Sequence, residues 1–392
     1  MDFQLNDEQR MIVETAGKLA KSFGPEYWLD KEESRAFPWE FLRECGKVGF
    51  FGFGIPEEYG GCGLGLTEGV LAFHEIASKG GGLGSILIYL FGPVFGGMSI
   101  HKHGNEEQKE KYLRKLTSGE MFVCLGLTEP NAGTNTLNVT TFAKKDGDDY
   151  VINGNKIFIS GFEDAGAIVL VSRTTKKDES KKRAFGLSLF LIDLPNEAIQ
   201  CTSIPKHGIN YLRTYELGIE DLRVPRSSLL GEEGKGWHHI LDTLNPERIM
   251  AATAGVGMGK AAISRAVEYA NQRQVFDSVI GAHQGIQFPL ASAYAKLECA
   301  WLATLKAAVL YDQQAPQKYV GDISNIAKYM ATEAAVEATC HAMRTLGGYG
   351  YAREYHIERW CREVNLIKLA PITQEMTLNY MAEHVLGMPR AY

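Results

Sequence analysis

The segment TEPNAGT at residues 128–134 has the residue types of a loop that approaches a flat ring or a phosphate closely. Its small side chains leave backbone N–H groups accessible, and its threonine hydroxyls can donate and accept hydrogen bonds. Alone, the segment is equally well explained as an ordinary loop. The pattern becomes specific because Gly126 and Leu127 precede it and the stretch KIFIS at residues 156–160 follows it.

Other candidate motifs for phosphate, nicotinamide or metal binding lack the residues or the spacing that these functions require. The stretch GVGMGK at residues 255–260 lacks the spacing and the final Ser or Thr of a phosphate-binding loop, and it lies inside a predicted helix. No GxGxxG sequence lies between a predicted strand and a helix, which argues against a Rossmann nicotinamide site. His101 and His103, and likewise His238 and His239, lack a third nearby metal ligand, so we expect no metal site.

The composition is that of a soluble globular protein. The chain has 392 residues, of which 45% are hydrophobic and 22% are charged, and its net charge is −6. This balance argues against a general nucleic-acid binder but leaves open a local basic pocket for an anionic ligand. Seven scattered cysteines without a CxxC pair disfavour disulfides and zinc, so a reducing, cytoplasmic location is expected. The charge run at residues 175–183 is expected to be an exposed loop.

One segment has the length of a membrane span. Residues 80–100 carry no charge, but they contain seven glycines and Pro93, so a spanning helix there would be poor. We expect a buried helical segment with a broken start, and no membrane association. The charged N-terminal sequence MDFQLNDEQR does not resemble a signal peptide.

The spacing of apolar residues changes twice along the chain. Helices are predicted at 8–23 (capped by Asn6), 39–48, 66–78, 85–103 and 106–117. Strands are predicted at 138–144, 150–153, 156–160, 168–173, 187–193 and 215–224, with turns at DGDD and NGN. Helices return at 237–272, 285–311, 322–346 and 373–386, as in a bundle. This order favours domains at 1–120, 121–232 and 233–392, and it differs from the alternation of a doubly wound fold.

Eleven motifs, in order along the chain, resemble those of the acyl-CoA dehydrogenase family. They are LNDEQRMI, GIPEEYGG, GNEEQKEKYL, TEPNAGT, INGNKIFIS, TYELGIEDLRVP, GEEGKGW, NQRQVF, AHQGIQ, LGGYGY and WCREV. The resemblance implies an α+β, mostly α fold with an N-terminal helical domain, a β-barrel-like middle domain and a C-terminal four-helix bundle. It also implies FAD, a homotetramer and an electron-transfer flavoprotein as electron acceptor. Residues 80–100 would line the acyl pocket, although helix packing explains their glycines equally well.

The resemblance assigns the FAD contacts to two groups of residues. Contacts to the flavin ring or its edge would be Leu125, Leu127, Thr128, Gly133, Thr134, Phe158 and Ser160, with Thr373 and Glu375 nearby. Contacts to the adenosine and pyrophosphate of an FAD in a neighbouring subunit would be Arg273, Phe276, Gln284, Arg344 and Gly348. Arginine suits this role because its guanidinium can bind two phosphate oxygens, although Arg344 stands where glutamine is usual. Without the resemblance, Arg273 would be interpreted as an exposed helix-end charge.

The implied reaction is α,β-dehydrogenation of an acyl-CoA thioester to the trans-2-enoyl-CoA, in which a carboxylate removes the α-proton and the flavin accepts the β-hydride. Most family members carry that carboxylate at the position of Pro371. A minority, including isovaleryl- and long-chain-type enzymes, supply it from an earlier helix, where this chain has Glu247 in the sequence NPERI. Glu247 is therefore the predicted base, and Glu375 is a weaker alternative.

The surroundings of Glu247 leave several alternatives open. From local sequence, Asn245 could instead cap a helix that begins at residue 246, with Glu247 favouring its positive end. Asn245 and Arg248, together with Thr134, are expected to contact the substrate. Pro371 lacks the N–H that helps bind the thioester carbonyl in the family, so either Ile372 donates or another group replaces it. A third alternative is a flavin reaction other than acyl-CoA dehydrogenation, such as enoyl-CoA reduction, a desulfinase-type elimination or the reaction of an oxygen-using relative. A fourth is a protein that binds a thioester without catalysis.

Overall fold

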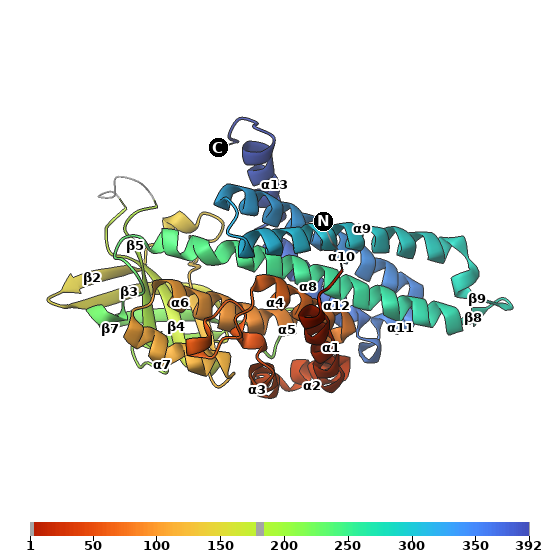
Figure 1. The fold of residues 1–392 in the computed structure, drawn as a ribbon, viewed down its shortest axis with the longest axis horizontal. Coiled ribbons are helices and arrows are strands. Elements are labelled where there is room, and N and C mark those ends of the chain that lie inside the picture. Colours follow the sequence, from red (N-terminus) through yellow and green to blue (C-terminus); the bar gives the residue numbers. More distant parts are fainter. Residues whose placement is uncertain (1–3, 178–183, 392) are drawn as a thin grey trace.

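The computed structural model describes residues 4–177 and 184–391 (Figure 1). Helices form both ends of the chain and a curled sheet forms the middle, which confirms the predicted helix–strand–helix order. The sheet lies at one end of an elongated molecule, and the long C-terminal helices extend toward the other end. Residues 178–183 of the predicted charged loop lie outside the described residues.

The N-terminal region is helical throughout. Its helices are α1 (Asp7–Ser22), α2 (Pro25–Ser34), α3 (Trp39–Lys47), α4 (Leu66–Ile76), α5 (Gly82–Tyr89), α6 (Ser99–His103) and α7 (Glu106–Thr117). Asn6 caps α1 by accepting a hydrogen bond from the backbone N–H of Gln9 at 2.8 Å, as predicted. The sequence pattern does not predict α2, because this helix buries only Trp28 and Lys31 and therefore has no continuous apolar stripe.

The uncharged segment lies inside the protein. Helices α4, α5 and α6 are joined by π-helical turns at Ala77–Gly81 and Leu90–Met98, so that Leu66–His103 is nearly continuous. This stretch is long and apolar enough to cross a membrane, but 89% of its most apolar window is buried. Positive φ angles at Gly80 (102°) and Gly82 (62°) break its start. The predicted buried segment with a broken start is thus confirmed.

The middle region forms one curled sheet. Its strands are β1 (Val123–Gly126), β2 (Phe142–Asp146), β3 (Asp149–Ser160), β4 (Ala167–Arg173), β5 (Leu187–Asp193), β6 (Ile199–Ser203) and β7 (Thr214–Pro225), in the order β1-β4-β2-β3-β7-β6 with β5 beside β4. The sequence DGDD makes the turn between β2 and β3, as predicted. The turn predicted at NGN is wrong, because residues 153–155 lie inside β3. The pairing with β7 shifts register there, and a bulge absorbs the turn-type residues without reversing the chain.

The C-terminal region is built on three long helices, α8 (Gly236–Gln272), α9 (Gln284–Asp312) and α10 (Gln317–Leu346). Shorter elements complete it: the hairpin β8 (Gln274–Val275) and β9 (Ser278–Val279), and helices α11 (Gly348–Tyr351), α12 (Ile357–Leu369) and α13 (Gln374–Tyr380). The alternative that a helix begins at Pro246 is wrong, because Pro246 lies inside α8. The glycines of residues 255–260 serve packing, as expected: a Cβ on Gly257 would lie 2.5 Å from Ala77 Cβ.

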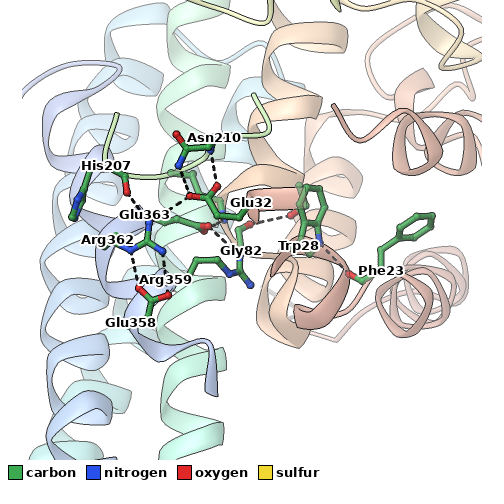
Figure 2. Close-up of polar contacts among 12 residues, drawn as sticks. Phe23, Trp28, Glu32, Gly82, His207, Asn210, Glu358, Arg359, Arg362 and Glu363 are labelled. Carbon is green, nitrogen blue, oxygen red and sulfur yellow. Dashed lines mark hydrogen bonds and ion pairs between the residues drawn. The ribbon is translucent and has the colours of Figure 1, made fainter. Parts of the chain in front are cut away.

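A buried polar cluster joins the three regions (Figure 2). Arg359 and Glu363 of α12 form an ion pair at 3.0 Å, and neither side chain is exposed to solvent. Glu363 also accepts the backbone N–H of Leu83 at the start of α5, at 3.0 Å. Nearby, Glu32 of α2 accepts two hydrogen bonds from Asn210 in the loop between β6 and β7. Charged hydrogen bonds of this kind fix how the helices of both ends meet the sheet.

Candidate active site

A buried ion pair anchors the TEPNAGT loop to strand β3. Lys156 of β3 donates to the Glu129 carboxylate at 2.9 Å and to the Leu127 carbonyl at 3.1 Å. Although burial opposes its ionisation, Lys156 and the donors of Thr140 and Thr141 lower the pKa of Glu129 to about 2. Burial lowers the pKa of Lys156 to about 8, against the attraction of Glu129. The carboxylate therefore stays ionised at neutral pH, and the loop is fixed to the sheet.

Phe158 is displayed outward by an irregularity of β3. The pairing of β3 with β7 shifts register between Lys156 and Ile159, and the backbone of Phe158 has a φ of 59°. A positive φ is uncommon for a bulky residue and marks a constrained position. The ring is 63% exposed, although its neighbours Lys156 and Ile159 are buried. The bulge thus presents a flat apolar surface beside the TEPNAGT loop.

The other residues predicted around the flavin lie on the same edge of the sheet. Leu125, Leu127 and Thr128 are half-buried, while Gly133 and Thr134 are exposed. The Ile157 N–H donates to the Thr128 carbonyl at 2.9 Å, which joins the loop to the bulged part of β3. The Ser160 hydroxyl lies 3.1 Å from that of Thr214. The loop that carries Thr128 is thus joined to the part of β3 that carries Phe158.

The second predicted group surrounds a hollow at the opposite end of the bundle. The hollow has a volume of about 680 Å³ and is lined by Arg273, Arg344 and Gly348, together with Tyr269 and Tyr349. Two arginines, one directly after α8 and one on α10, thus line the hollow together with two aromatic rings, a combination suited to a phosphate-bearing nucleoside.

Two further residues of this group project beside the hollow. Phe276, at the tip of the β8–β9 hairpin, is 95% exposed, and Gln284 at the start of α9 is also exposed. The hairpin and the sheet lie at opposite ends of the molecule (Figure 1). The two predicted groups of residues are therefore not brought together within one chain.

Glu247 is a buried carboxylate on α8. Its side chain is only 9% exposed, and none of the described residues donates a hydrogen bond to it. Burial raises the pKa of Glu247 to about 8, although the nearby cations Arg248 and Lys328 act in the opposite direction. A carboxyl group with this pKa can take up a proton near neutral pH, as a general base requires.

The predicted neighbours of Glu247 make a polar lining beside it. Arg248 donates to the Asn245 side chain at 3.2 Å, while its Nε is buried without a partner among the residues described. Lys328 of α10, which the sequence analysis did not single out, completes the group. A lone lysine inside a predicted helix carries no signal that distinguishes it from a surface lysine. Only the packing of α10 against α8 reveals its burial.

The segment 370–373 lies next to this group. Thr373 caps α13 by accepting the Met376 N–H, and Glu375 is exposed on the first turn of that helix. Glu375 is therefore less suited than Glu247 to act as a base in a dry pocket. The backbone N–H of Ile372 makes no hydrogen bond with any residue that the structure describes.

The histidines weighed as metal ligands form a different contact. His103 and His239 pack their rings with centroids 4.2 Å apart, and His103 also lies 3.0 Å from Asp242. Within residues 4–177 and 184–391, no group of three or more His, Cys, Asp or Glu side chains is arranged to hold a metal ion. All seven cysteines are free thiols.

Comparison with known proteins assigns nearly the whole chain to one family. Residues 6–120, 124–222 and 234–386 match the families described as the acyl-CoA dehydrogenase N-terminal, middle and C-terminal domains. The chain is 36% identical over 387 residues to the acyl-CoA dehydrogenase FadE12 of Mycobacterium tuberculosis, covering 99% of this chain and 98% of that one. It is 35% identical over 390 residues to the acryloyl-CoA reductase (NADH) of Anaerotignum propionicum, covering 98% and 96%.

Solved structures agree with this assignment. The butyryl-CoA dehydrogenase of Megasphaera elsdenii matches with a TM-score of 0.91 at 30% identity, over 98% of this chain and all of that one. A glutaryl-CoA dehydrogenase complex matches with a TM-score of 0.93 at 30% identity, over 100% and 98% of the two chains. The chain therefore belongs to the acyl-CoA dehydrogenase family, whose members are FAD-dependent oxidoreductases.

Proposed function

We propose that the protein dehydrogenates an acyl-CoA thioester to the trans-2-enoyl-CoA, with Glu247 as the base. The observation that carries the proposal is the buried carboxyl of Glu247, which lacks a hydrogen-bond donor among the described residues and has a pKa of about 8. Pro371, at the usual position of the base, has no acidic group. The likeness to acyl-CoA, butyryl-CoA and glutaryl-CoA dehydrogenases supports the same reaction class.

The residues present fit FAD at both of its ends. The exposed Phe158 ring and the threonine-rich loop suit the flavin, and a Cβ on Gly133 would meet no atom within 4 Å, so the backbone there is open to a close approach. Arg273 and Arg344 at the hollow suit the pyrophosphate. When bound, FAD supplies the acceptor for the hydride that leaves the β-carbon.

These ends lie far apart in one chain, so we infer that a second copy completes each FAD site (Figure 1). The tetramer expected from the resemblance would provide that copy. The domain boundaries near residues 120 and 232 also remain a prediction. An electron-transfer flavoprotein is the proposed electron acceptor, in line with the matched flavoprotein structure of Acidaminococcus fermentans, with a TM-score of 0.92 at 31% identity over 98% and 100% of the two chains.

The chain's own residues have three tasks in this reaction. Glu247 takes the α-proton onto a carboxylate oxygen, and its dry surroundings make the ionised form a strong base. The electron pair of that C–H bond forms the new double bond as the β-hydride leaves. The Ile372 N–H, which has no hydrogen-bond partner in the part of the chain that the structure describes, donates to the thioester oxygen on which negative charge develops. Arg248 and Asn245, which are hydrogen-bonded to each other beside Glu247, are the proposed contacts to the substrate.

A second candidate function is the reverse reaction, reduction of an enoyl-CoA. Two relatives at 35% identity are reductases, the acryloyl-CoA reductase already named and the 3-(aryl)acrylate reductase of Clostridium sporogenes. The same residues serve both directions, because a base that removes the α-proton can return it. Direction is decided by which substrate class changes the oxidation state of the flavin.

The test follows flavin absorbance under anaerobic conditions with a panel of straight, branched, cyclic and aryl acyl-CoAs. We expect at least one saturated thioester to bleach the flavin, and Glu247→Gln to slow that bleaching about 10²–10⁴-fold. Glu268→Gln is the matched control, because Glu268 lies on the same helix α8 but is exposed. Unchanged bleaching in Glu247→Gln contradicts the assignment. Oxidation of the reduced flavin by enoyl-CoAs alone favours the reductase.

A further inference from the structure

Lys328 is a fully buried cation that, among the described residues, donates hydrogen bonds only to the segment beside Glu247. It lies on α10 with 0% of its surface exposed. Its ammonium donates to the Ile372 carbonyl at 2.8 Å and to Gln374 Oε1 at 2.9 Å. A buried ammonium requires such acceptors, because desolvation is costly without them. The position of residues 372–374 and the position of the lysine are therefore fixed together.

The Gln374 side chain extends this contact into a chain of polar groups. Its amide nitrogen donates to Glu333 at 3.0 Å, and Glu333 in turn pairs with Lys368 of α12 at 2.9 Å. Lys328 is thus the innermost member of a network that ends at the surface of the bundle. The network leaves little freedom for residues 372–374, which precede and begin α13.

Charged groups from three helices face the Lys328 ammonium. Arg248 of α8 disfavours its protonation, while Glu375 of α13, Glu333 of α10 and Glu247 of α8 favour it. Burial, together with Arg248, lowers the pKa of Lys328 to about 8. In return, Lys328 acts to lower the pKa of Glu247. One ammonium thus interacts with the segment that would bind the thioester oxygen and with the carboxyl that would take the α-proton.

We propose that Lys328 is a positioning residue that couples the two halves of the reaction. By holding the Ile372 carbonyl, it anchors the peptide unit that follows Ile372 and so limits the movement of the Ile372 backbone, whose own N–H is offered to the thioester oxygen in a segment where Pro371 provides no donor. By its charge, it favours the ionised form of Glu247 and stabilises the negative charge that develops on the substrate. The inference rests on the proposed function of Glu247.

The test compares Lys328→Met and Lys328→Arg with Lys318→Met in the FAD-loaded enzyme. Lys318 is a matched control, because it lies on the same helix and also donates to one carbonyl and one side-chain oxygen, but at the surface. The measurement is the rate of anaerobic flavin reduction, from pH 6 to 10, by the acyl-CoA that reduces the wild-type enzyme fastest.

We expect Lys328→Met to move the acid limb of the pH profile upward by about one unit, because Glu247 loses a cation that favours its ionisation. We expect its plateau rate to fall about tenfold or more. Lys328→Arg keeps the charge, so its acid limb stays near that of the wild type while its plateau falls, because the guanidinium cannot reproduce the ammonium's contacts. Lys318→Met changes neither quantity.

A wild-type acid limb in Lys328→Met overturns the inference, since a purely structural lysine would change stability and not the pH profile. If Lys328→Met does not retain FAD, the test relies on Lys328→Arg. A plateau rate of flavin reduction in Lys328→Arg equal to that of the wild type overturns the inference. The outcomes are distinguishable from failure of the proposed function. An active Glu247→Gln defeats the proposed function, whereas an inactive Glu247→Gln with an unchanged Lys328→Met profile defeats only this inference.

Discussion

Lys156 and Glu129 form an ion pair at 2.9 Å directly beneath the TEPNAGT loop, with side chains that are 0% and 3% exposed. The lysine comes from the strand that carries the bulged Phe158, and the glutamate comes from the loop itself. The pair therefore connects the two segments that would face the flavin ring. A buried pair of this kind contributes little net stability compared with apolar packing, but breaking it is costly because one charge remains without a partner.

We predict that Lys156→Met destabilises the protein by about 3–5 kcal/mol and weakens FAD binding. The expected cause is the buried Glu129 carboxylate, which loses its cation but keeps its threonine donors. Thermal unfolding and the FAD content of the purified protein measure the two effects. Lys144→Met, at an exposed position of the neighbouring strand β2, is the control. A double variant, Lys156→Met with Glu129→Gln, should recover part of the loss, and a single variant no worse than the control would contradict the prediction.

The pKa of Glu247 predicts opposite pH trends for activity and stability. Because the pKa is about 8, only about a tenth of the carboxyl groups are ionised at pH 7, so flavin reduction should accelerate about fivefold between pH 7 and pH 8. The folded state holds this proton more tightly than the unfolded chain. Stability should therefore fall as the pH rises from the ordinary glutamate value to about 8, and then level off.

The variant Glu247→Gln separates this contribution to stability from all other titrating groups. We expect its melting temperature to match the wild type near pH 5, where both side chains are neutral, and to exceed it above pH 8. Unfolding curves recorded from pH 5 to 9 test the difference between the two proteins. Parallel curves across this range would show that Glu247 does not titrate as its burial requires.

The hollow at the far end of the bundle predicts the effect of removing its cations. Arg273→Ala and Arg344→Gln should each weaken FAD binding about tenfold, because a charge-assisted hydrogen bond to phosphate is lost. Fluorescence titration of the apoprotein with FAD gives the dissociation constants. Arg223→Ala is the control, since Arg223 pairs with Asp146 and Asp149 on the sheet. Affinity equal to that of the control would remove both arginines from the proposed site.

The glycines of the uncharged segment do not all serve the same purpose. A Cβ on Gly96 would lie 2.9 Å from Val123 Cβ, so this glycine is required for packing. Gly92 is also buried, yet a Cβ there would meet no atom within 4 Å outside its own neighbourhood. The turn Leu90–Met98 that carries Gly92 packs against both α8 and β1. Open space therefore remains beside Gly92, in the segment predicted to line the acyl pocket.

We predict that Gly92→Val folds normally but shifts substrate preference toward smaller acyl groups. The added methyl groups would occupy the open space, so the kcat/KM for bulky or branched acyl-CoAs should fall by about tenfold or more relative to short straight chains. Gly96→Ala is the comparison, and it should lose stability because its Cβ overpacks against Val123. A uniform loss of activity across all chain lengths in Gly92→Val would contradict a role in specificity.

Much of the architecture is determined by local patterns in the sequence. The spacing of apolar residues predicts most helices, and the change from helical to strand patterns gives the order of the three regions, because amphipathic elements must each bury one face. The glycines and Pro93 of the uncharged stretch 80–100 correctly predict that this stretch is buried in the protein. The pattern fails where local signals are weak or misleading, as at α2 and at the NGN sequence inside β3. There, packing and strand pairing override the turn propensity.

The environment of each candidate site residue is decided only by the tertiary structure. Local sequence permits Glu247 to begin a helix, but the structure buries it inside α8, and burial is what raises its pKa. Lys328 is 81 residues away in the chain, and only the packing of α10 against α8 brings its charge within reach. Desolvation and charge interactions depend on distance in space, so the composition of a local segment cannot specify them.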